Sequence, residues 1–594
     1  MKFLKQGFSR EDLLRIDEKD LPVLADEVRA FIVDTVTKNG GHLGSSLGAV
    51  ELTIAMLRKF NPLNDKIIFD VGHQSYPYKI LTDRFDKFHT LRLKDGISGF
   101  PRRNESPYDH FNTGHSSTSI SAALGYAKAR DLLHEDRHVI AFIGDASLIN
   151  GLALEALNYI HETNTKIIII LNDNRHSISN RVGGFSTVLA GLSANTFYRS
   201  IKNSIRKKAG VKYSPFFEKF RDIFKFIMKP SNIFDELDIN YWGPFDGHDI
   251  KNAEKVLELA KNYYRPVLLH FNTIKGKGLP EAEENPTKYH QLSPMGTKKL
   301  RTWSEAASNI IEEFAEKDNR IICFTAAMIT GVKLENFAKK FPERFFDVGI
   351  AEEHAVTLAA GMAAGGLKPV VAIYSTFIQR AYDQVLHDVC LQNLPVIFCL
   401  DRAGLENELV QMLFAAAEKN KPVAIRYPRG AGLNVAVDKV VKKLDWGKCE
   451  VVYKSLEPEI VIFAVGSMVK TSIDAAKILA DKKIFAEVIN ARFIKPFDRE
   501  FLKIKSQSVK LLVTAEEGIL NGGFGAAVAE FLADENISVP VLRFGIQDRF
   551  IEHGSRGELL EICGLTSKQI AEKIAEKLSG KEDIKIYSRN INRT

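Results

Sequence analysis

Cysteine is scarce in this chain of 594 residues. The five cysteines are odd in number and widely spaced, and none forms a C-x-x-C pair; they are Cys323, Cys390, Cys399, Cys449 and Cys563. A disulfide framework usually needs an even and denser set, and a structural zinc site needs closely spaced pairs. The sequence therefore predicts neither feature, and a reducing cytoplasm fits it best.

The chain also lacks a long apolar run and a strong excess of charge of one sign. Charged residues interrupt the first positions before an apolar segment develops, and no apolar run approaches the length of a membrane span. The 81 basic and 74 acidic residues give a net charge of +7, and the basic residues are spread along the chain. We therefore expect a cytoplasmic protein that binds neither membranes nor nucleic acid.

What is present is the composition of an ordinary globular protein, with 45% hydrophobic and 26% charged residues. A chain of this length is expected to form two to four domains, each large enough for its own core. Strand and helix patterns alternate in three successive regions, residues 1–300, 301–445 and 446–594. The sequence therefore predicts an α/β fold with three domains over these ranges.

The most informative stretch lies in residues 139–179. Residues 140–143 are an apolar strand that ends at Gly144 and Asp145, residues 151–162 are a helix, and residues 167–171 are a second apolar strand that leads to Asn174. Asp145 and Asn174 are about one strand–helix–strand repeat apart. Because ligands of parallel sheets bind at the carboxyl ends of the strands, we expect both residues at the same sheet edge.

Asp145 and Asn174 offer oxygen ligands. A carboxylate and an amide oxygen suit Mg²⁺ that holds a diphosphate, and the start of the helix after Asp145 favours phosphate. The alternative is an ordinary α/β crossover in which Asp145 caps the helix and Asn174 is a turn residue. The pair alone does not separate these two interpretations.

Gly144-Asp145 followed at this distance by Leu171-Asn172-Asp173-Asn174 resembles the thiamine-diphosphate motif of the transketolase superfamily. Within it, the chain resembles the 1-deoxy-D-xylulose-5-phosphate synthase family from about Asp17 to Ile574. The resemblance implies three doubly wound domains of transketolase type, two that bind the cofactor and one C-terminal domain. Further phrases that carry it are Gly40-Gly41-His42-Leu43-Gly44-Ser45-Ser46, Asp70-Val71-Gly72-His73-Gln74, Gly114-His115-Ser116-Ser117-Thr118-Ser119, Gly349-Ile350-Ala351-Glu352-Glu353-His354 and Tyr374-Ser375-Thr376-Phe377.

The resemblance implies an enzyme that acts as a homodimer with thiamine diphosphate and Mg²⁺. Such an enzyme condenses pyruvate with glyceraldehyde 3-phosphate, loses CO₂ and forms 1-deoxy-D-xylulose 5-phosphate for isoprenoid, thiamine and pyridoxal synthesis. The cofactor serves as the electron sink for the decarboxylation. A buried glutamate, here Glu352, shares a proton with the aminopyrimidine ring of the cofactor and so activates it.

The resemblance also assigns the remaining site residues. The implied catalytic residues are Glu352, His42, His73 and His290. The implied cofactor contacts are His73, Gly114, His115, Ser116, Gly144, Asp145, Ala146, Ser147, Asn174, Lys275, Leu279, Ile350, Glu352 and Phe377. The implied substrate contacts are His42, Tyr374, Arg380, Arg402 and Arg429, with Arg426 competing for the role of Arg429. The implied metal ligands are Asp145, Asn174 and His176, the last through its backbone carbonyl.

The chain departs from the family pattern at several positions. Ala146 stands where a glycine is usual beside the diphosphate, and Leu279 stands where a tyrosine is usual against the cofactor. After Leu405 a loop, a helix and a strand of the family are missing, and a helix over residues 406–419 follows directly. We expect the loss of an interior strand to disturb the sheet, because the helix then joins a different strand end.

Other interpretations stay open at this point. One is another enzyme of the superfamily, a ketose-transferring transketolase or a 2-oxo-acid decarboxylating component. A second is a thiamine-diphosphate-binding protein without turnover, which the missing segment, Ala146 and Leu279 favour. Residues 181–230 are basic and aromatic; they match an active-site flap of the family, and the alternative is a helix at a membrane surface.

Overall fold

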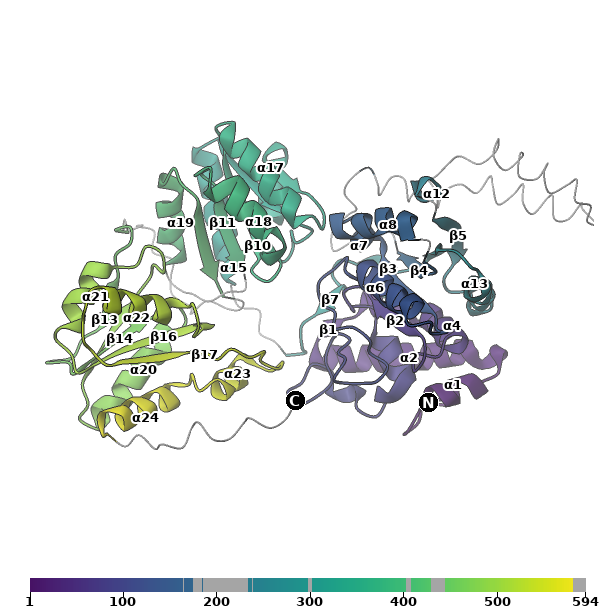
Figure 1. Cartoon of the computed structure of the whole chain (residues 1–594), viewed down its shortest axis with the longest axis horizontal. Helices are drawn as coiled ribbons and strands as arrows, with labels where there is room; N and C mark the ends of the chain where they lie inside the picture. The colour runs from purple at the N-terminus through teal and green to yellow at the C-terminus, as the bar shows by residue number, and fades with distance from the viewer. Residues whose placement is uncertain are drawn as a thin grey trace, which may run out of the picture. The chain divides into compact units, whose positions relative to one another are not determined.

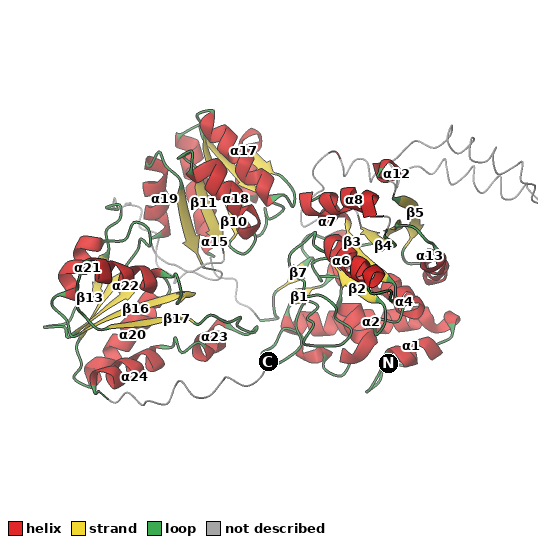
Figure 2. Cartoon of the chain, viewed as in Figure 1, coloured by secondary structure: helices red, strands yellow, loops and turns green. Residues whose placement is uncertain are grey.

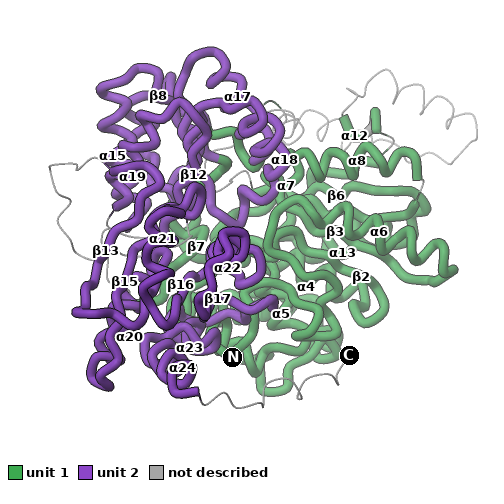
Figure 3. Tube along the Cα trace, turned by 60° about the vertical axis from the view of Figure 1, so that its left-hand side comes forward, with its two compact units in different colours: residues 1–298, 326–328, 347–351 green, residues 299–325, 329–346, 352–594 purple. Residues whose placement is uncertain are grey.

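The computed structural model describes residues 1–163, 165–174, 184, 233–237, 239–296, 302–401, 408–428 and 444–580. The chain forms two compact units (Figure 3). Unit 1 comprises residues 1–298, 326–328 and 347–351, and unit 2 comprises residues 299–325, 329–346 and 352–594.

Unit 1 is built on a five-stranded parallel sheet in the order β2-β3-β4-β6-β5. Figure 1 labels four of these strands, β2, β3, β4 and β5. The two central strands are buried along their whole length, as is typical of a parallel sheet covered on both faces. The strands are β2 (Lys66–Phe69), β3 (Val139–Gly144), β4 (Ile168–Asp173), β5 (Asn240–Asp246) and β6 (Val267–Asn272). A separate antiparallel pair consists of β1 (Gly41–His42) and β7 (Gln291–Leu292).

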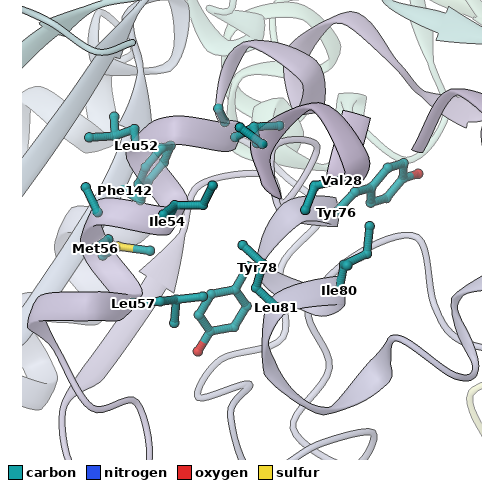
Figure 4. Packing of buried hydrophobic residues seen from close by; sticks show 14 of the residues in the cluster. Val28, Leu52, Ile54, Met56, Leu57, Tyr76, Tyr78, Ile80, Leu81 and Phe142 are labelled. Carbon is teal, nitrogen blue, oxygen red and sulfur yellow. The ribbon is translucent and has the colours of Figure 1, made fainter. Parts of the chain in front are cut away.

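Successive residues of the central strands enter two different cores. Ile140 and Phe142 of β3 pack with residues of α2, α4 and α13, whereas Ala141 and Ile143 pack with residues of α6 and α8. This alternation follows from the two-residue period of a strand. Figure 4 shows part of the first core, in which Phe142 lies among Leu52, Ile54 and Met56 of α4. Both faces of the sheet are therefore covered.

The start of α13 in unit 1 is fixed by a side-chain cap, because Asp249 accepts the backbone N–H of Asn252 at 3.0 Å. The helical elements are α1 (Arg10–Arg15), η1 (Glu18–Asp20), α2 (Leu21–Asn39), α3 (Gly44–Gly48), α4 (Val50–Lys59), α5 (Tyr76–Lys79), η2 (Ile80–Arg84), η3 (Phe88–Thr90), α6 (Ser119–Leu132), α7 (Asp145–Leu148), α8 (Gly151–Thr163), α12 (Ile233–Glu236), α13 (Ile250–Asn262) and α14 (Pro280–Glu284).

Unit 2 contains a second five-stranded sheet in the order β12-β11-β10-β8-β9. Its strands are β8 (Ile321–Thr325), β9 (Phe345–Asp347), β10 (Lys368–Tyr374), β11 (Ile397–Asp401) and β12 (Val423–Tyr427). The helical elements that accompany it are α15 (Trp303–Lys317), α16 (Glu335–Lys340), η4 (Pro342–Arg344), α17 (Glu352–Ala364), η5 (Ile378–Ala381), α18 (Tyr382–Gln384), η6 (Val385–Cys390) and α19 (Leu409–Glu418). Figure 2 separates helices and strands by colour.

The predicted disturbance of this sheet after Leu405 is wrong for the described strands. β11 and β12 are direct parallel neighbours, with Ile397 opposite Val423 and Asp401 opposite Tyr427. Relative to the family pattern the chain lacks a loop, a helix and a strand together. Because this is a complete helix–strand repeat, α19 still connects two parallel neighbours. Leu405 itself lies outside the described residues.

The third sheet, also in unit 2, has the order β13-β15-β14-β16-β17, with antiparallel β13 and otherwise parallel pairs. Its strands are β13 (Glu450–Tyr453), β14 (Ile460–Ala464), β15 (Ala486–Asn490), β16 (Leu511–Ile519) and β17 (Val541–Ile546). Its helices are α20 (Met468–Asp481), α21 (Arg499–Ser506), α22 (Phe524–Asp534), α23 (Arg556–Ile562) and α24 (Ser567–Leu578). Apolar clusters lie on both faces of this sheet as well.

The three sheets confirm the predicted α/β class and its three sheet-based parts. The predicted strand, helix and strand around Asp145 are confirmed as β3, α8 and β4, with ends shifted by one or two residues. The exact domain boundaries stay a prediction. Within the described residues, no helix combines the length and apolar character that crossing a membrane requires.

Candidate functional site

Two neighbouring strand ends of unit 1 carry the predicted metal ligands. β3 ends at Gly144 and β4 ends one residue before Asn174, and the register pairs Gly144 with Asn172. Asp145 opens α7 and is 4% exposed, and Asn174 is 8% exposed. The structure thus brings a carboxylate and an amide to adjoining positions at the carboxyl edge of the sheet.

A chain of polar side chains runs beneath this edge. Thr273 Oγ1 donates to Asn172 Oδ1 at 2.6 Å, and Asn172 Nδ2 donates to Gln74 Oε1 at 3.0 Å. Gln74 Nε2 lies 3.5 Å from His73 Nε2. A side chain on Gly144 would place its Cβ 3.2 Å from Gln74 Nε2, so glycine leaves room for this chain. The network ends at His73. Asn172 and Thr273 were not among the predicted site residues: Asn172 was noted only as part of the motif around Asn174, and Thr273 directly follows β6.

The loop with Gly114, His115 and Ser116 is tied to the same edge. The carboxylate of Asp70, which follows β2, accepts the backbone N–H groups of Ser117 at 2.8 Å and Ser119 at 3.1 Å. Ser117 Oγ donates to the carbonyl of Ser147 at 2.8 Å, and Ser147 is buried in α7 beside half-buried Ala146. The three predicted contact residues are themselves half-buried.

Three histidines from distant parts of the sequence come together in unit 1. The ring centroids of His42 and His73 are 6.1 Å apart, those of His42 and His290 5.6 Å, and those of His73 and His290 5.8 Å. The pairing of His42 with Gln291 in β1 and β7 brings His290 to this place. All three residues are half-buried. Among the described residues, the enclosed Nδ1 atoms of His42 and His73 have no hydrogen-bond partner.

Burial keeps these histidines neutral. It lowers the pKa of His73 to about 3, with a smaller effect of the Lys275 charge. Burial also lowers the pKa of His42 and of His290 well below the usual value, and the neighbouring histidines and Lys275 add to the effect. At neutral pH each ring therefore has one N–H donor and one acceptor nitrogen and no net charge.

Lys275 lies next to the metal-ligand edge. Its side chain is almost fully buried, and burial lowers its pKa to about 8, against the opposing charge of Asp145. The backbone N–H of Gly276 donates to the carbonyl of Gly44 at 2.8 Å and fixes this segment on α3. Leu279 follows, half-buried and packed on the apolar core.

The predicted catalytic glutamate lies in unit 2. Glu352 opens α17 and is 3% exposed, and its Oε2 lies 3.5 Å from Nη1 of Arg380. Burial raises the pKa of this carboxyl group, while the Arg380 charge opposes the rise. Arg380, which the sequence assigned to substrate binding, is thus an ion-pair partner of Glu352. Ile350 precedes this helix and belongs to unit 1, where its carbonyl accepts from Asn150 Nδ2 at 2.7 Å.

Tyr374, the last residue of β10, and Phe377 form a stacked pair, with ring centroids 5.8 Å apart and an interplanar angle of 29°. A Cβ on Gly331 would lie 1.8 Å from the Tyr374 hydroxyl, so this position requires glycine. Tyr374 pairs with Asp401 of β11, whose carbonyl accepts the N–H of Ser375 at 2.8 Å. The stacked pair therefore occupies the carboxyl edge of the second sheet.

Some predicted site residues lie outside the described residues: His176, Arg402, Arg429 and the basic, aromatic segment 181–230. Within the described part of the chain, no group of three or more His, Cys, Asp and Glu side chains could hold a metal. Asp145 and Asn174 supply hard oxygen donors next to a helix start and a buried lysine. This donor set fits Mg²⁺ shared with a diphosphate and does not fit zinc.

Comparison with known proteins gives consistent matches over three parts of the chain. Residues 4–273 match a family model described as 1-deoxy-D-xylulose-5-phosphate synthase. Residues 299–408 match the transketolase pyrimidine-binding domain, and residues 447–570 match the transketolase C-terminal domain.

Curated relatives match the chain over almost its full length. The 1-deoxy-D-xylulose-5-phosphate synthase of Alkaliphilus oremlandii is 44% identical, covering 97% of this chain and 99% of the relative. The enzyme of the same name from Caldanaerobacter subterraneus is also 44% identical, with the same coverage. Among solved structures, a split-gene transketolase β4 tetramer matches 48% of this chain and all of its own, with 28% identity and a TM-score of 0.43.

Proposed function

The chain belongs to the 1-deoxy-D-xylulose-5-phosphate synthase family, and from this premise we propose which of its residues perform the reaction. The enzyme is a thiamine-diphosphate-dependent transferase that condenses pyruvate with glyceraldehyde 3-phosphate and releases CO₂. When bound, thiamine diphosphate supplies the electron sink for decarboxylation.

Asp145 and Asn174 hold Mg²⁺ against the diphosphate, together with the backbone carbonyl of His176. Support comes from their adjoining strand ends and from the burial of both side chains. The start of α7 and the buried Lys275 add positive potential where the phosphates bind. The remaining contacts to the cofactor come from Gly114, His115, Ser116, Gly144, Ala146, Ser147, Leu279, Ile350 and Phe377.

Glu352 is the residue that would exchange a proton with the pyrimidine ring of bound thiamine diphosphate. Burial raises the pKa of its carboxyl group, which favours the protonated form that can donate to the ring. Arg380 limits that rise and keeps the carboxyl group in one orientation. The stacked Phe377 supplies an apolar ring next to the pyrimidine.

The cluster of His42, His73 and His290 is the observation that carries the proposal. Its ring centroids are 5.6 to 6.1 Å apart, and burial lowers the pKa of all three rings and so favours their neutral form. Neutral imidazoles donate hydrogen bonds to developing negative charge and accept protons without adding a positive charge. We assign His73 to the cofactor side, His42 to the substrate, and His290 to proton transfer.

Substrate phosphate is held by planar guanidinium groups and a tyrosine hydroxyl. The proposed set is Tyr374, Arg380, Arg402 and Arg429. Guanidinium forks suit a phosphate monoester.

The proposal also includes a homodimer in the cytoplasm and domains that span residues 1–300, 301–445 and 446–594.

Calorimetric titration of the purified chain with thiamine diphosphate tests the metal-ligand assignment. Wild-type protein is expected to bind the cofactor only when Mg²⁺ is present. Asp145→Asn is expected to lose most of this Mg²⁺-dependent binding. Asp136→Asn is a matched control, since Asp136 is exposed and precedes the other end of β3. Equal Mg²⁺-dependent binding by wild type and Asp145→Asn would contradict the assignment.

A further inference from the structure

His248 connects two segments of unit 1 that lie far apart in the sequence. The backbone N–H of Ile274 donates to His248 Nε2 at 2.8 Å. On the other side of the ring, His248 Nδ1 lies 3.0 Å from Oε2 of Glu51 in α4. The backbone N–H of His248 donates to Asp246 Oδ1 at 2.9 Å and holds the residue in its turn. The imidazole therefore bridges a helix and the segment that contains Lys275.

These two contacts fix the tautomer of His248. A backbone N–H is always a donor, so Nε2 must be the unprotonated nitrogen that accepts it. The proton of the neutral ring is then on Nδ1, where it is donated to the Glu51 carboxylate. A carboxylate on Nδ1 is the usual means of selecting this tautomer.

The Glu51 carboxylate is kept charged in a buried place. Its side chain is 10% exposed and forms an ion pair with Arg29, whose side chain is 9% exposed. Burial raises the pKa of Glu51, but the His248 hydrogen bond and the Arg29 charge outweigh it, so the pKa is lowered overall. Arg29 also lies against the loop that contains Lys275 and Gly278, because a Cβ on Gly278 would lie 2.8 Å from Arg29 Cδ.

The segment that His248 holds lies directly on the helices behind it. A Cβ on Gly48 would lie 2.7 Å from the carbonyl oxygen of Ile274, and one on Gly44 would lie 3.3 Å from Cγ of Lys275. The space around the backbone of Ile274 and the side chain of Lys275 is small. Two hydrogen bonds, one at each end of this segment, are needed to hold it in a single position. One is from Gly276 to Gly44, and the other is from Ile274 to His248.

We propose that His248 is a positioning residue that, through its acceptor nitrogen on Ile274 and its donor nitrogen on Glu51, sets the place of Lys275 at the diphosphate site. The inference deepens the proposed function and rests on it for the role of Lys275. His248 acts through the backbone of the neighbouring segment and touches neither substrate nor cofactor.

Two substitutions of His248 separate the two sides of the ring. The amide of His248→Asn can replace Nδ1 at Glu51 but does not reach Ile274, whereas the amide oxygen of His248→Gln lies near the position of Nε2. We expect amide exchange at residues 274–278 to be about tenfold faster in His248→Asn and close to wild type in His248→Gln. The strands of unit 2 should exchange equally in all variants.

Calorimetry with thiamine diphosphate and Mg²⁺ supplies the functional readout on the full chain. The dissociation constant should rise about tenfold in His248→Asn and by less than about threefold in His248→Gln. Lys251→Ala is the control, since Lys251 is exposed and forms only a surface ion pair with Glu18.

Exchange at residues 274–278 that is the same in His248→Asn and wild type would overturn the inference. So would a ten times weaker binding that His248→Gln does not restore. Failure of the wild-type chain to bind cofactor would instead contradict the proposed function, and the exchange contrast would still decide the positioning role.

Discussion

Burial sets the charge of the ionisable residues at the candidate site. It raises the pKa of Glu352 and lowers the pKa of His73, His42 and Lys275, in each case as the largest cause. The shifts go in opposite directions: burial favours the protonated form of Glu352 in unit 2 and the neutral forms of the histidines and Lys275 in unit 1. Under the proposed function, these residues are the proton donors and acceptors of the reaction.

Replacement of Glu352 by glutamine should remove the proton exchange with the cofactor and keep the shape of the side chain. We expect kcat to fall by about 10² to 10⁴-fold, with cofactor binding almost unchanged. Because burial disfavours the charged carboxyl group, the melting temperature should not fall. CO₂ release from pyruvate measures the effect. Glu353→Gln, at the adjacent and half-buried position, is the matched control, and an equal loss in both variants would contradict the role of Glu352.

His73 should contribute to the loss of stability in acid. Its pKa is about 3 in the folded state and about 6.5 when unfolded, so between these values the unfolded chain binds one proton more. Stability therefore falls as pH decreases from about 6.5 toward 3, by up to about 1.4 kcal/mol per pH unit from this group. His73→Gln should reduce that slope in urea unfolding of unit 1 measured without cofactor. An unchanged slope would show that the ring is not held neutral.

Several site residues could be predicted from the sequence because they follow strand patterns at a fixed spacing. Asp145 and Asn174 are of this kind, and the register of β3 and β4 places them together. Contacts that depend on tertiary folding could not be predicted. His248 and Glu51 are 197 positions apart, and neither is part of a local pattern that indicates the other.

At the level of the elements, two glycines of α3 let this helix approach the segment with Lys275. Gly44 and Gly48 have no side chain where the carbonyl of Ile274 and the stem of Lys275 lie. Alternation in β3 then divides its side chains between two cores, as strand geometry requires. The strands and helices were predictable from such periodicity. The order of the strands in the sheet could not be predicted, because a hydrophobic pattern does not indicate which strands are neighbours.

Gly48→Ala tests this close packing. Alanine in place of glycine gains up to about 1 kcal/mol in a helix interior. Gly48 is instead the last residue of the short helix α3, and a new Cβ there would lie 2.7 Å from the carbonyl oxygen of Ile274. We expect a loss of about 1 to 3 kcal/mol and weaker cofactor binding, since overpacking forces the segment to move. Gly125→Ala in α6 is the control, because a Cβ there meets no atom within 4 Å. Similar gains in thermal stability for both variants would argue against the packing account.

At the level of the whole molecule, each of the two units carries part of the proposed set of site residues. Unit 1 provides the Asp145 edge and the three histidines, and unit 2 provides Glu352 and the Tyr374–Phe377 pair. The sheet around the shortened region is continuous in its described strands, with β12 directly beside β11. A disturbed sheet was predicted there from the loss of an interior strand, but the missing helix and strand form one complete repeat, so β11 and β12 still pair in parallel.

Removal of divalent metal should lower the melting temperature of the protein with bound thiamine diphosphate. With one carboxylate and one amide as described ligands, the chain offers few donors of its own, so Mg²⁺ and the diphosphate should bind together. After treatment with a chelator, thiamine diphosphate should no longer raise the melting temperature, and added Mg²⁺ should restore the rise. A cofactor-dependent rise that persists in excess chelator would contradict the proposed metal site.

The most direct measurement is the reaction of the purified chain with pyruvate and glyceraldehyde 3-phosphate in the presence of thiamine diphosphate and Mg²⁺. CO₂ release and pentulose-phosphate formation should rise together, and both should require glyceraldehyde 3-phosphate for turnover at the full rate. This result would show that the chain acts as a synthase without the segment that is missing after Leu405. Saturable cofactor binding with neither CO₂ nor pentulose phosphate formed would contradict the account.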